Sequence, residues 1–196
     1  MNGSSTARRA FSVVFLILLS ASPLMLYAAT PDAGPSAARI LDRAESQARA
    51  EHKNILLEFG ASWCVNCKLY DRMLNDSAMR AILSPHFVFA SMDSGEHRGD
   101  TRHTNTPGAV EYENSIGGKD AGWPFLVVLD ARGKPIVNSF RPDPNSKAGE
   151  NIGYPVLPQE VDWFITMPER GAPSLIRRQV DEVHAWLTKQ AAKIPH

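Results

Sequence analysis

The chain has 196 residues, of which 21 are basic and 21 are acidic, so its formal net charge is zero. Without a basic stripe or a charged tail, this composition argues against a nucleic-acid partner. The length suits one domain with a hydrophobic core of its own.

The N-terminus has the layout of a secretory signal peptide. Arg8 and Arg9 precede an apolar run over residues 10–19, and Leu26-Tyr27-Ala28 offers a small residue for cleavage. An uncleaved membrane anchor stays open, because no charged residue interrupts positions 10–30. We expect contact with a membrane only in that second case.

These features predict a signal peptide over residues 1–28, a flexible lead-in over 29–36 and a single domain over 37–196. Export predicts a periplasmic location. Because thiols can oxidise outside the cytosol, a pair of cysteines there is expected to form a disulfide at least part of the time.

The first half of the domain alternates between predicted helices and strands. Residues 37–52 contain helix formers throughout, with apolar residues at helical spacing. A short apolar run over 54–60 predicts a strand buried on both faces, and 87–93 predicts a second strand. Between them we predict a helix over 64–74 and another helical turn that begins at Asp76, a residue type suited to the N-cap.

The second half contains two long predicted loops. Residues 94–122 are polar and contain glycine, which predicts a loop with one helix around 109–114; residues 141–157 predict another loop. The other predicted elements are a strand over 124–130, a turn over 131–134, an antiparallel strand over 135–140, and helices over 160–167 and 174–193. The residues of the last helix predicted to face the core are Leu175, Ile176, Val180, Val183 and Leu187.

The only two cysteines are Cys64 and Cys67, two residues apart at a predicted strand-to-helix junction. The unpaired N–H groups and the dipole at a helix N-terminus favour a thiolate on Cys64, and the thiolate is the nucleophile. Cys67, nearly one turn along, could then resolve a mixed disulfide. Two alternatives remain open: a structural disulfide, although it would close a very short loop, and a zinc site, although two cysteines supply half the usual ligands.

Two segments resemble the thioredoxin-like family. Residues 57–68, Leu-Glu-Phe-Gly-Ala-Ser-Trp-Cys-Val-Asn-Cys-Lys, resemble its active-site segment, and residues 122–134, which begin Gly-Trp-Pro-Phe, resemble its cis-proline strand and hairpin. The Cys-Val-Asn-Cys-Lys variant is most similar to reductase-type periplasmic modules, such as the C-terminal domain of the transmembrane thiol-disulfide interchange protein. The resemblance implies an α/β thioredoxin fold, a central mixed sheet flanked by helices. This chain adds an insertion before the cis-proline strand and a further C-terminal segment.

The resemblance implies a role for each matching residue around the cysteines. Cys64 is expected to attack and Cys67, which is expected to be the buried thiol, to resolve. Glu58 stands at the position of the family's buried carboxylate and is expected to exchange protons with Cys67. Asp71 stands where the most similar modules carry a second acid, although a solvated helix residue is an equal alternative. Trp63 is expected to shield the site.

The resemblance also implies a substrate-binding element at Trp123 and Pro124. The bond between them is expected to be cis, which leaves the Trp123 backbone available to a client strand. Trp123 is bulkier than the usual residue at this position, so the choice of partner is expected to be unusual. His97 and His103, in the insertion, are expected to be exposed loop histidines rather than metal ligands.

We therefore predict a periplasmic thiol–disulfide oxidoreductase that works on the reducing side. Val65 and Asn66 supply no positive charge to stabilise a thiolate, which favours that direction. The expected partners are client proteins with disulfides or thiols and a membrane or periplasmic dithiol electron donor, with no cofactor and no metal. The alternative function is a non-catalytic assembly factor for cytochrome c or copper sites that holds a metal or a client through the same cysteines.

Overall fold

The computed structural model describes residues 34–194, so the predicted signal peptide and most of the lead-in lie outside the described residues. Within residues 34–194, no helix is both long enough and apolar enough to cross a membrane.

Four strands form the central sheet in the order β2-β1-β3-β4. They are β1 (Asn54–Gly60), β2 (Phe87–Asp93), β3 (Phe125–Leu129) and β4 (Pro135–Asn138). β1 pairs with β2 in parallel and with β3 in antiparallel orientation, and β3 pairs antiparallel with β4. Nearly every residue of β1 and β3 is buried, as expected for strands covered on both faces, whereas β2, at the edge of the sheet, is partly exposed.

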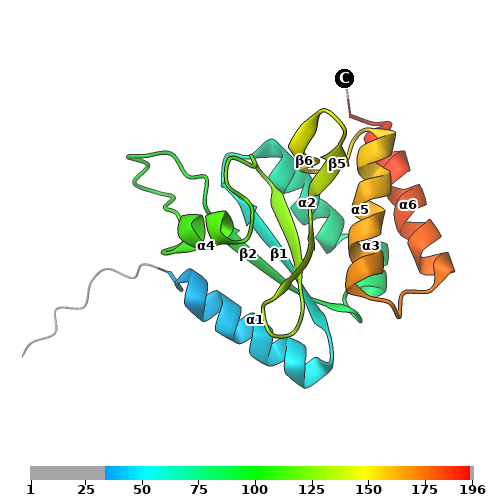
Figure 1. Ribbon diagram of the computed structural model, residues 1–196, viewed down its shortest axis with the longest axis horizontal. Helices are drawn as coiled ribbons and strands as arrows, with labels where there is room; N and C mark the ends of the chain where they lie inside the picture. The colour runs from blue at the N-terminus through cyan, green and yellow to red at the C-terminus, as the bar shows by residue number, and fades with distance from the viewer. Residues whose placement is uncertain (1–33, 195–196) are drawn as a thin grey trace, which may run out of the picture. The chain divides into compact units, whose positions relative to one another are not determined.

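Helices cover both faces of this sheet (Figure 1). Their bounds are α1 (Ala37–Glu51), α2 (Val65–Asn75), α3 (Ser77–Leu83), α4 (Ala109–Ser115), α5 (Pro158–Gly171) and α6 (Arg177–Ala191). The predicted cap at Asp76 is confirmed, because its carboxylate accepts hydrogen bonds from the N–H groups of Ala78 and Met79.

The alternation of side chains along each strand separates two hydrophobic cores. On β1, Ile55, Leu57 and Phe59 pack with α1 and α4 in one core. Leu56 faces the other core, which contains buried residues of α2, α3, α5 and α6. Glu58 shares the face of Leu56, because side chains two positions apart in a strand point the same way. The result is the predicted three-layer α/β arrangement of a thioredoxin fold.

The prediction of a loop over 141–157 is wrong. This region contains a second, two-stranded antiparallel sheet of β5 (Phe140–Asp143) and β6 (Ser146–Asn151). Figure 1 shows the hairpin at the top of the view, beside α5. Its strands contain Pro142 and Gly149 and few residues with high β-propensity, so the sequence pattern gave no strand signal.

Two further boundaries differ from expectation. α5 continues through Pro168 to Gly171, although proline in a helix interior normally ends or kinks the helix. Ile176 was predicted to face the core but is 55% exposed, because it is the N-cap of α6 and precedes the first buried position of that helix. Val180, Val183 and Leu187 are buried as predicted.

Candidate active site

The cysteine pair lies where β1 leads into α2. A turn after β1, closed by a hydrogen bond from the Cys64 N–H to the Ala61 carbonyl at 3.0 Å, brings the chain to the helix. Cys64 is the N-cap, and its Sγ accepts a hydrogen bond from the Cys67 N–H at 3.0 Å. The two cysteines form a disulfide with their Cα atoms 5.3 Å apart. Cys64 therefore occupies the position at which helix N–H groups stabilise a negative sulfur.

Burial does not distinguish the two sulfur-bearing residues, although Cys67 was expected to be the shielded one. Cys64 is 4% exposed and Cys67 is 5% exposed. Both belong to a small cluster with Ala61, against which Trp123 packs. In the disulfide form, the two cysteines are therefore shielded from solvent to the same extent.

Glu58 is buried beside the cysteines, as the sequence predicted. It is 6% exposed, so the alternative of a strand-edge glutamate in water is excluded. Burial, together with the nearby Asp71 and Asp93 carboxylates, raises the pKa of Glu58 from 4.5 to about 8. A pKa close to neutral pH allows a carboxyl group to both accept and return a proton under working conditions.

The glycine between Glu58 and the active-site turn leaves space for the two reacting groups. A Cβ atom at Gly60 would lie 3.2 Å from Cys67 Sγ and 3.4 Å from Glu58 Oε1. The Glu58 carboxyl and the Cys67 sulfur thus approach the same point above the strand. Any side chain at position 60 would occupy the space between them.

A cavity of about 150 Å³ connects the acidic groups with Cys67, and its lining includes Glu58, Cys67, Asp71 and Asp93. A neighbouring cavity of about 350 Å³ is also lined by Glu58 and Asp71. Partial burial raises the pKa of Asp71, and burial with the charge of Glu96 raises that of Asp93. Asp71 is thus close to Glu58, as the resemblance implied, and Asp93 is an acid of this cavity that the sequence analysis missed. The parallel register that pairs Gly60 with Asp93 could have indicated it.

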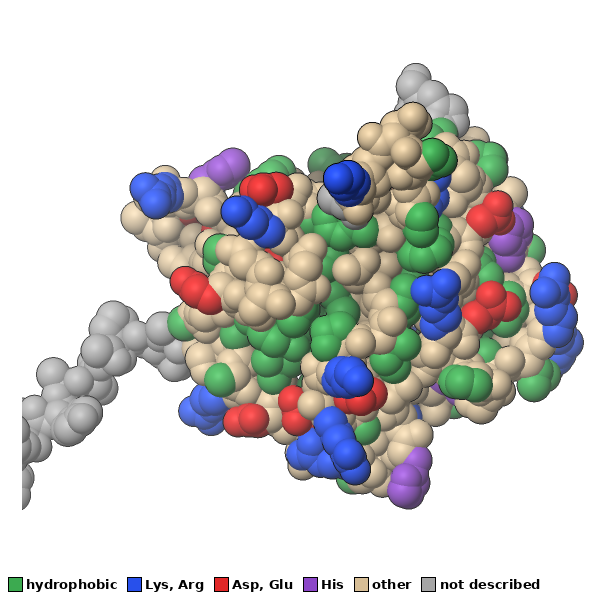
Figure 2. Space-filling model, viewed as in Figure 1, with side chains coloured by type: hydrophobic (Ala, Val, Ile, Leu, Met, Phe, Trp, Pro, Cys, Tyr) green, Lys and Arg blue, Asp and Glu red, His purple; other side chains and the backbone are tan. Residues whose placement is uncertain are grey.

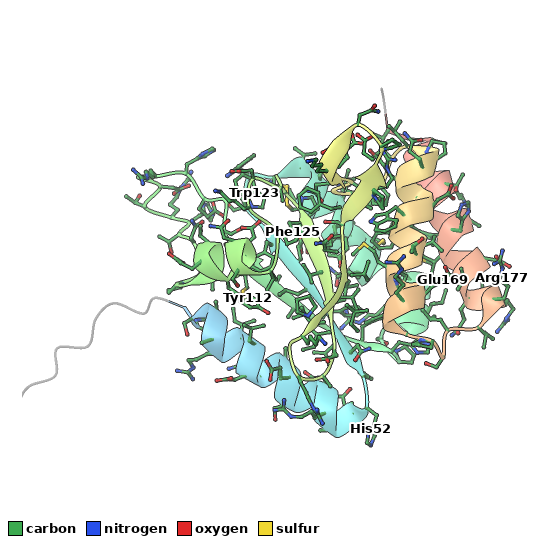
Figure 3. All side chains as sticks on the ribbon, viewed as in Figure 1. His52, Tyr112, Trp123, Phe125, Glu169 and Arg177 are labelled. Atoms are coloured by element: carbon green, nitrogen blue, oxygen red, sulfur yellow. A yellow bond between two sulfur atoms is a disulfide. The ribbon has the colours of Figure 1, made fainter. Side chains whose placement is uncertain are left out.

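The Trp123–Pro124 peptide is cis, as predicted. Pro124 is buried, and Trp123 packs against the cysteine cluster and meets Trp63 edge-on, with ring centroids 5.7 Å apart. Figure 3 shows Trp123 and Phe125 on the same side of the sheet as Tyr112 of α4. The two sequence segments predicted to form the site are therefore brought together.

The first insertion packs onto the site through residues 94–97, which the sequence analysis left without a role. Trp123 Nε1 donates to Ser94 Oγ at 2.9 Å, and Trp63 Nε1 donates to the Gly95 carbonyl at 2.9 Å. The Glu96 carboxylate accepts hydrogen bonds from both the backbone and the hydroxyl of Ser62. His97 is an exposed loop residue, as predicted, and its ring stacks on Trp63 with centroids 4.8 Å apart.

One group of side chains in the described part of the chain has the spacing of cation ligands: Glu96, Asp100 and His103. It contains neither cysteine. Its carboxylates already have partners, because Glu96 holds Ser62 and Asp100 pairs with His103 at 3.2 Å. The group is therefore explained as a set of contacts that orders the insertion.

A family model described as thioredoxin-like matches residues 37–131. A comparison with curated proteins finds no match. Among solved structures, the chain is similar to a disulphide isomerase from Xylella fastidiosa Temecula1, with 20% identity over 76% of this chain and 87% of that chain and a TM-score of 0.43. It is also similar to a DsbH oxidoreductase, with 27% identity over 60% of this chain and 82% of that chain and a TM-score of 0.33. A thioredoxin-fold protein from Helicobacter pylori shows 18% identity over 70% of this chain and 86% of that chain, with a TM-score of 0.37.

The matched segment contains β1, the cysteine pair and β3, which are the elements that build the site. Over residues 37–131, close to half of its length, the chain matches the thioredoxin-like family. A disulfide of Cys-x-x-Cys spacing at the N-terminus of a helix, next to a cis-proline, is the arrangement of a thiol–disulfide oxidoreductase.

Proposed function

We propose that the protein is a periplasmic oxidoreductase that reduces disulfides in client proteins. The observation that carries this proposal is the Cys64–Cys67 pair at the N-terminus of α2, within reach of a buried carboxyl group whose pKa is near neutral. Export, which would bring it to the periplasm, rests on the N-terminal sequence alone.

The reaction starts from the dithiol form. The Cys64 thiolate attacks one sulfur of the client disulfide, forms a mixed disulfide and releases the other client sulfur as a thiolate. Cys67 then gives its proton to Glu58 and attacks the Cys64 sulfur, which releases the second client thiolate. The client gains two electrons, and the Cys64–Cys67 pair loses two electrons and becomes a disulfide.

The proton taken by Glu58 leaves through the cavity that Asp71 and Asp93 line. To regenerate the dithiol, the Cys64–Cys67 disulfide needs two electrons and two protons, and Cys64 gives up one of these protons when it forms the attacking thiolate. A membrane or periplasmic dithiol protein is the proposed donor. The exposed side chain of Val65, 68% accessible beside the disulfide, offers an apolar contact for either partner.

The proposed direction rests on Val65 and Asn66, which place no charge between the cysteines. A pair whose thiolate is strongly stabilised is a strong oxidant, with a potential of about −120 mV, whereas thioredoxin has a potential of about −270 mV. We expect a value near that of thioredoxin, measured by equilibration with glutathione or dithiothreitol. A potential near −120 mV would reverse the proposed direction.

Insulin reduction in the presence of dithiothreitol tests the activity. Wild-type protein is expected to accelerate insulin precipitation, and Cys64→Ser protein is expected to have no effect. Metal analysis of the purified, reduced protein tests the alternative of an assembly factor. Stoichiometric metal without insulin reduction would favour that alternative over the proposed reaction.

A further inference from the structure

The hairpin β5–β6 and the residues that follow it have no part in the thiol chemistry, yet they contact the cis-proline loop. At the end of β6, Asn151 Nδ2 donates hydrogen bonds to three backbone carbonyls: those of Ala121 at 2.9 Å, Gly122 at 3.2 Å and Pro124 at 3.1 Å. One side chain thus connects both ends of the turn that carries Trp123. Figure 3 shows that Trp123 stands at this end of the sheet, near the hairpin.

The orientation of the Asn151 amide is itself fixed. Its Oδ1 accepts hydrogen bonds from the Ser139 hydroxyl at 2.6 Å and from the Gly153 N–H at 3.4 Å. Ser139 is fully buried, and its Oγ accepts a hydrogen bond from the Leu126 N–H at 2.9 Å. Because the oxygen faces donors, the nitrogen must face the carbonyls.

A second contact supports the loop from the same segment. The backbone of Gly153 lies against the cis-proline, so that a Cβ atom there would stand 3.6 Å from Pro124 Cδ. On the opposite side, the Trp123 ring is held by Ser94, whose hydroxyl in turn bonds the buried Glu113 carboxyl. The backbone of the loop is therefore held by the hairpin segment and its side chain by the first insertion.

We propose that Asn151 is a positioning residue that holds the backbone of residues 121–124 in the orientation needed to receive an extended client strand. This inference rests on the proposed function, in which polypeptide disulfides are the substrates, and adds the residue that orients the backbone to which a client strand would bind through main-chain hydrogen bonds. A small disulfide offers no strand, so its reaction with Cys64 does not depend on Asn151. Preorganisation of the loop lowers the ordering cost of client binding.

The test compares two substrates in the reduced protein. Asn151→Asp keeps the size of the side chain but replaces the donating amide with a carboxylate, which turns three hydrogen bonds into three repulsive contacts with carbonyl oxygens. We expect the rate constant with insulin to fall about 10-fold, as for the loss of a partly buried hydrogen bond. The rate constant with hydroxyethyl disulfide should stay within about twofold of that of the wild type.

The matched control is Asn145→Asp, the same chemical change at the exposed turn of the same hairpin. Within the described residues, the Asn145 side chain forms a hydrogen bond only with Asp143. It should leave both rate constants unchanged. Equal slowing of both substrates by Asn151→Asp, or no slowing of either, would overturn the positioning role. Asn151→Ala, a milder loss of the same donor, replaces Asn151→Asp if that variant does not fold.

Amide hydrogen exchange of the oxidised protein provides a readout that needs no activity. Exchange in the peptide that covers residues 121–126 should be faster in Asn151→Asp and Asn151→Ala than in wild type and in Asn145→Asp. Wild-type protein that reacts with hydroxyethyl disulfide but never with insulin would contradict the proposed function, and the exchange data would still decide the role of Asn151. Unchanged exchange in both variants would refute it.

Discussion

The substitution Glu58→Gln tests the central electrostatic feature of the site, first through stability. The pKa of Glu58 is 4.5 in the unfolded chain and about 8 in the fold. The unfolded chain therefore loses the proton first, and stability falls as the pH rises from about 4.5 to about 8. Full ionisation in the fold costs about 5 kcal/mol, and the loss between pH 5 and 8 is roughly 3 to 4 kcal/mol.

The glutamine variant should lack this contribution. In urea denaturation of the oxidised protein, we expect the stability of Glu58→Gln relative to wild type to increase by roughly 3 kcal/mol between pH 5 and 8. Asp71 and Asp93 titrate in both proteins, so the difference reports the ionisation of Glu58, including its repulsion by these two carboxylates. A difference that stays constant across this range would show that Glu58 keeps an ordinary pKa, and the reasoning from burial would be wrong.

Kinetics of the same variant test the proton transfer. Attack by Cys64 on a client disulfide should be nearly unchanged, whereas the resolving step by Cys67 should be about 10- to 100-fold slower, as for loss of a positioned base. Stopped-flow measurement of both steps between pH 6 and 8 separates them. The control is Glu111→Gln, the same chemical change at an exposed glutamate of α4 that does not line the cavity with Cys67. An unaltered resolving rate in Glu58→Gln would refute the role of Glu58.

Four further substitutions have direct outcomes. Cys67→Ser should accumulate mixed disulfides with clients and Cys64→Ser should accumulate none, as seen on non-reducing gels; equal alkylation of the two thiols in the reduced protein would argue against Cys64 as the sole attacking group. Gly60→Ala should slow the resolving step, because the added Cβ would stand 3.2 Å from Cys67 Sγ. Stopped-flow traces that match those of the wild type would contradict this. Ser94→Ala should cost about 1 kcal/mol in urea denaturation, because Trp123 Nε1 loses its acceptor; no change in stability would show that this bond contributes nothing.

The sequence was sufficient to predict the parts of the fold whose signal is local. β3 is an uninterrupted apolar run and β1 is apolar apart from Asn54 and Glu58, and strands of that kind lie inside a sheet covered on both faces. The burial of Glu58 followed from its being the one charged residue in such a run. The cysteine spacing and the Trp-Pro pair carried the site because both are short contiguous motifs.

The parts that could not be predicted depend on contacts between distant segments. The strands β5 and β6 contain Pro142 and Gly149, so their pairing is visible only once the chain is folded. Asn151 looks like a loop residue in the sequence and acquires three carbonyl partners some 30 positions earlier. Equal burial of Cys64 and Cys67 results from the Trp123 ring, whose direction no local pattern determines.

The bulky residue before the cis-proline is explained by the first insertion. A Cβ atom at position 95 would stand 2.6 Å from the Trp123 ring, so the indole fits against the backbone only because residue 95 is glycine. The same stretch supplies Ser94 for the indole N–H, and its Gly95 carbonyl accepts from Trp63. Figure 2 shows hydrophobic side chains exposed in the middle of one face of the molecule, with charged groups towards its rim. Trp123 and the first insertion therefore form one structural unit. The large residue before the cis-proline needs Ser94 and Gly95 of the insertion, and the insertion in turn packs on the Trp123 ring. Together they shape the surface on which a client would lie.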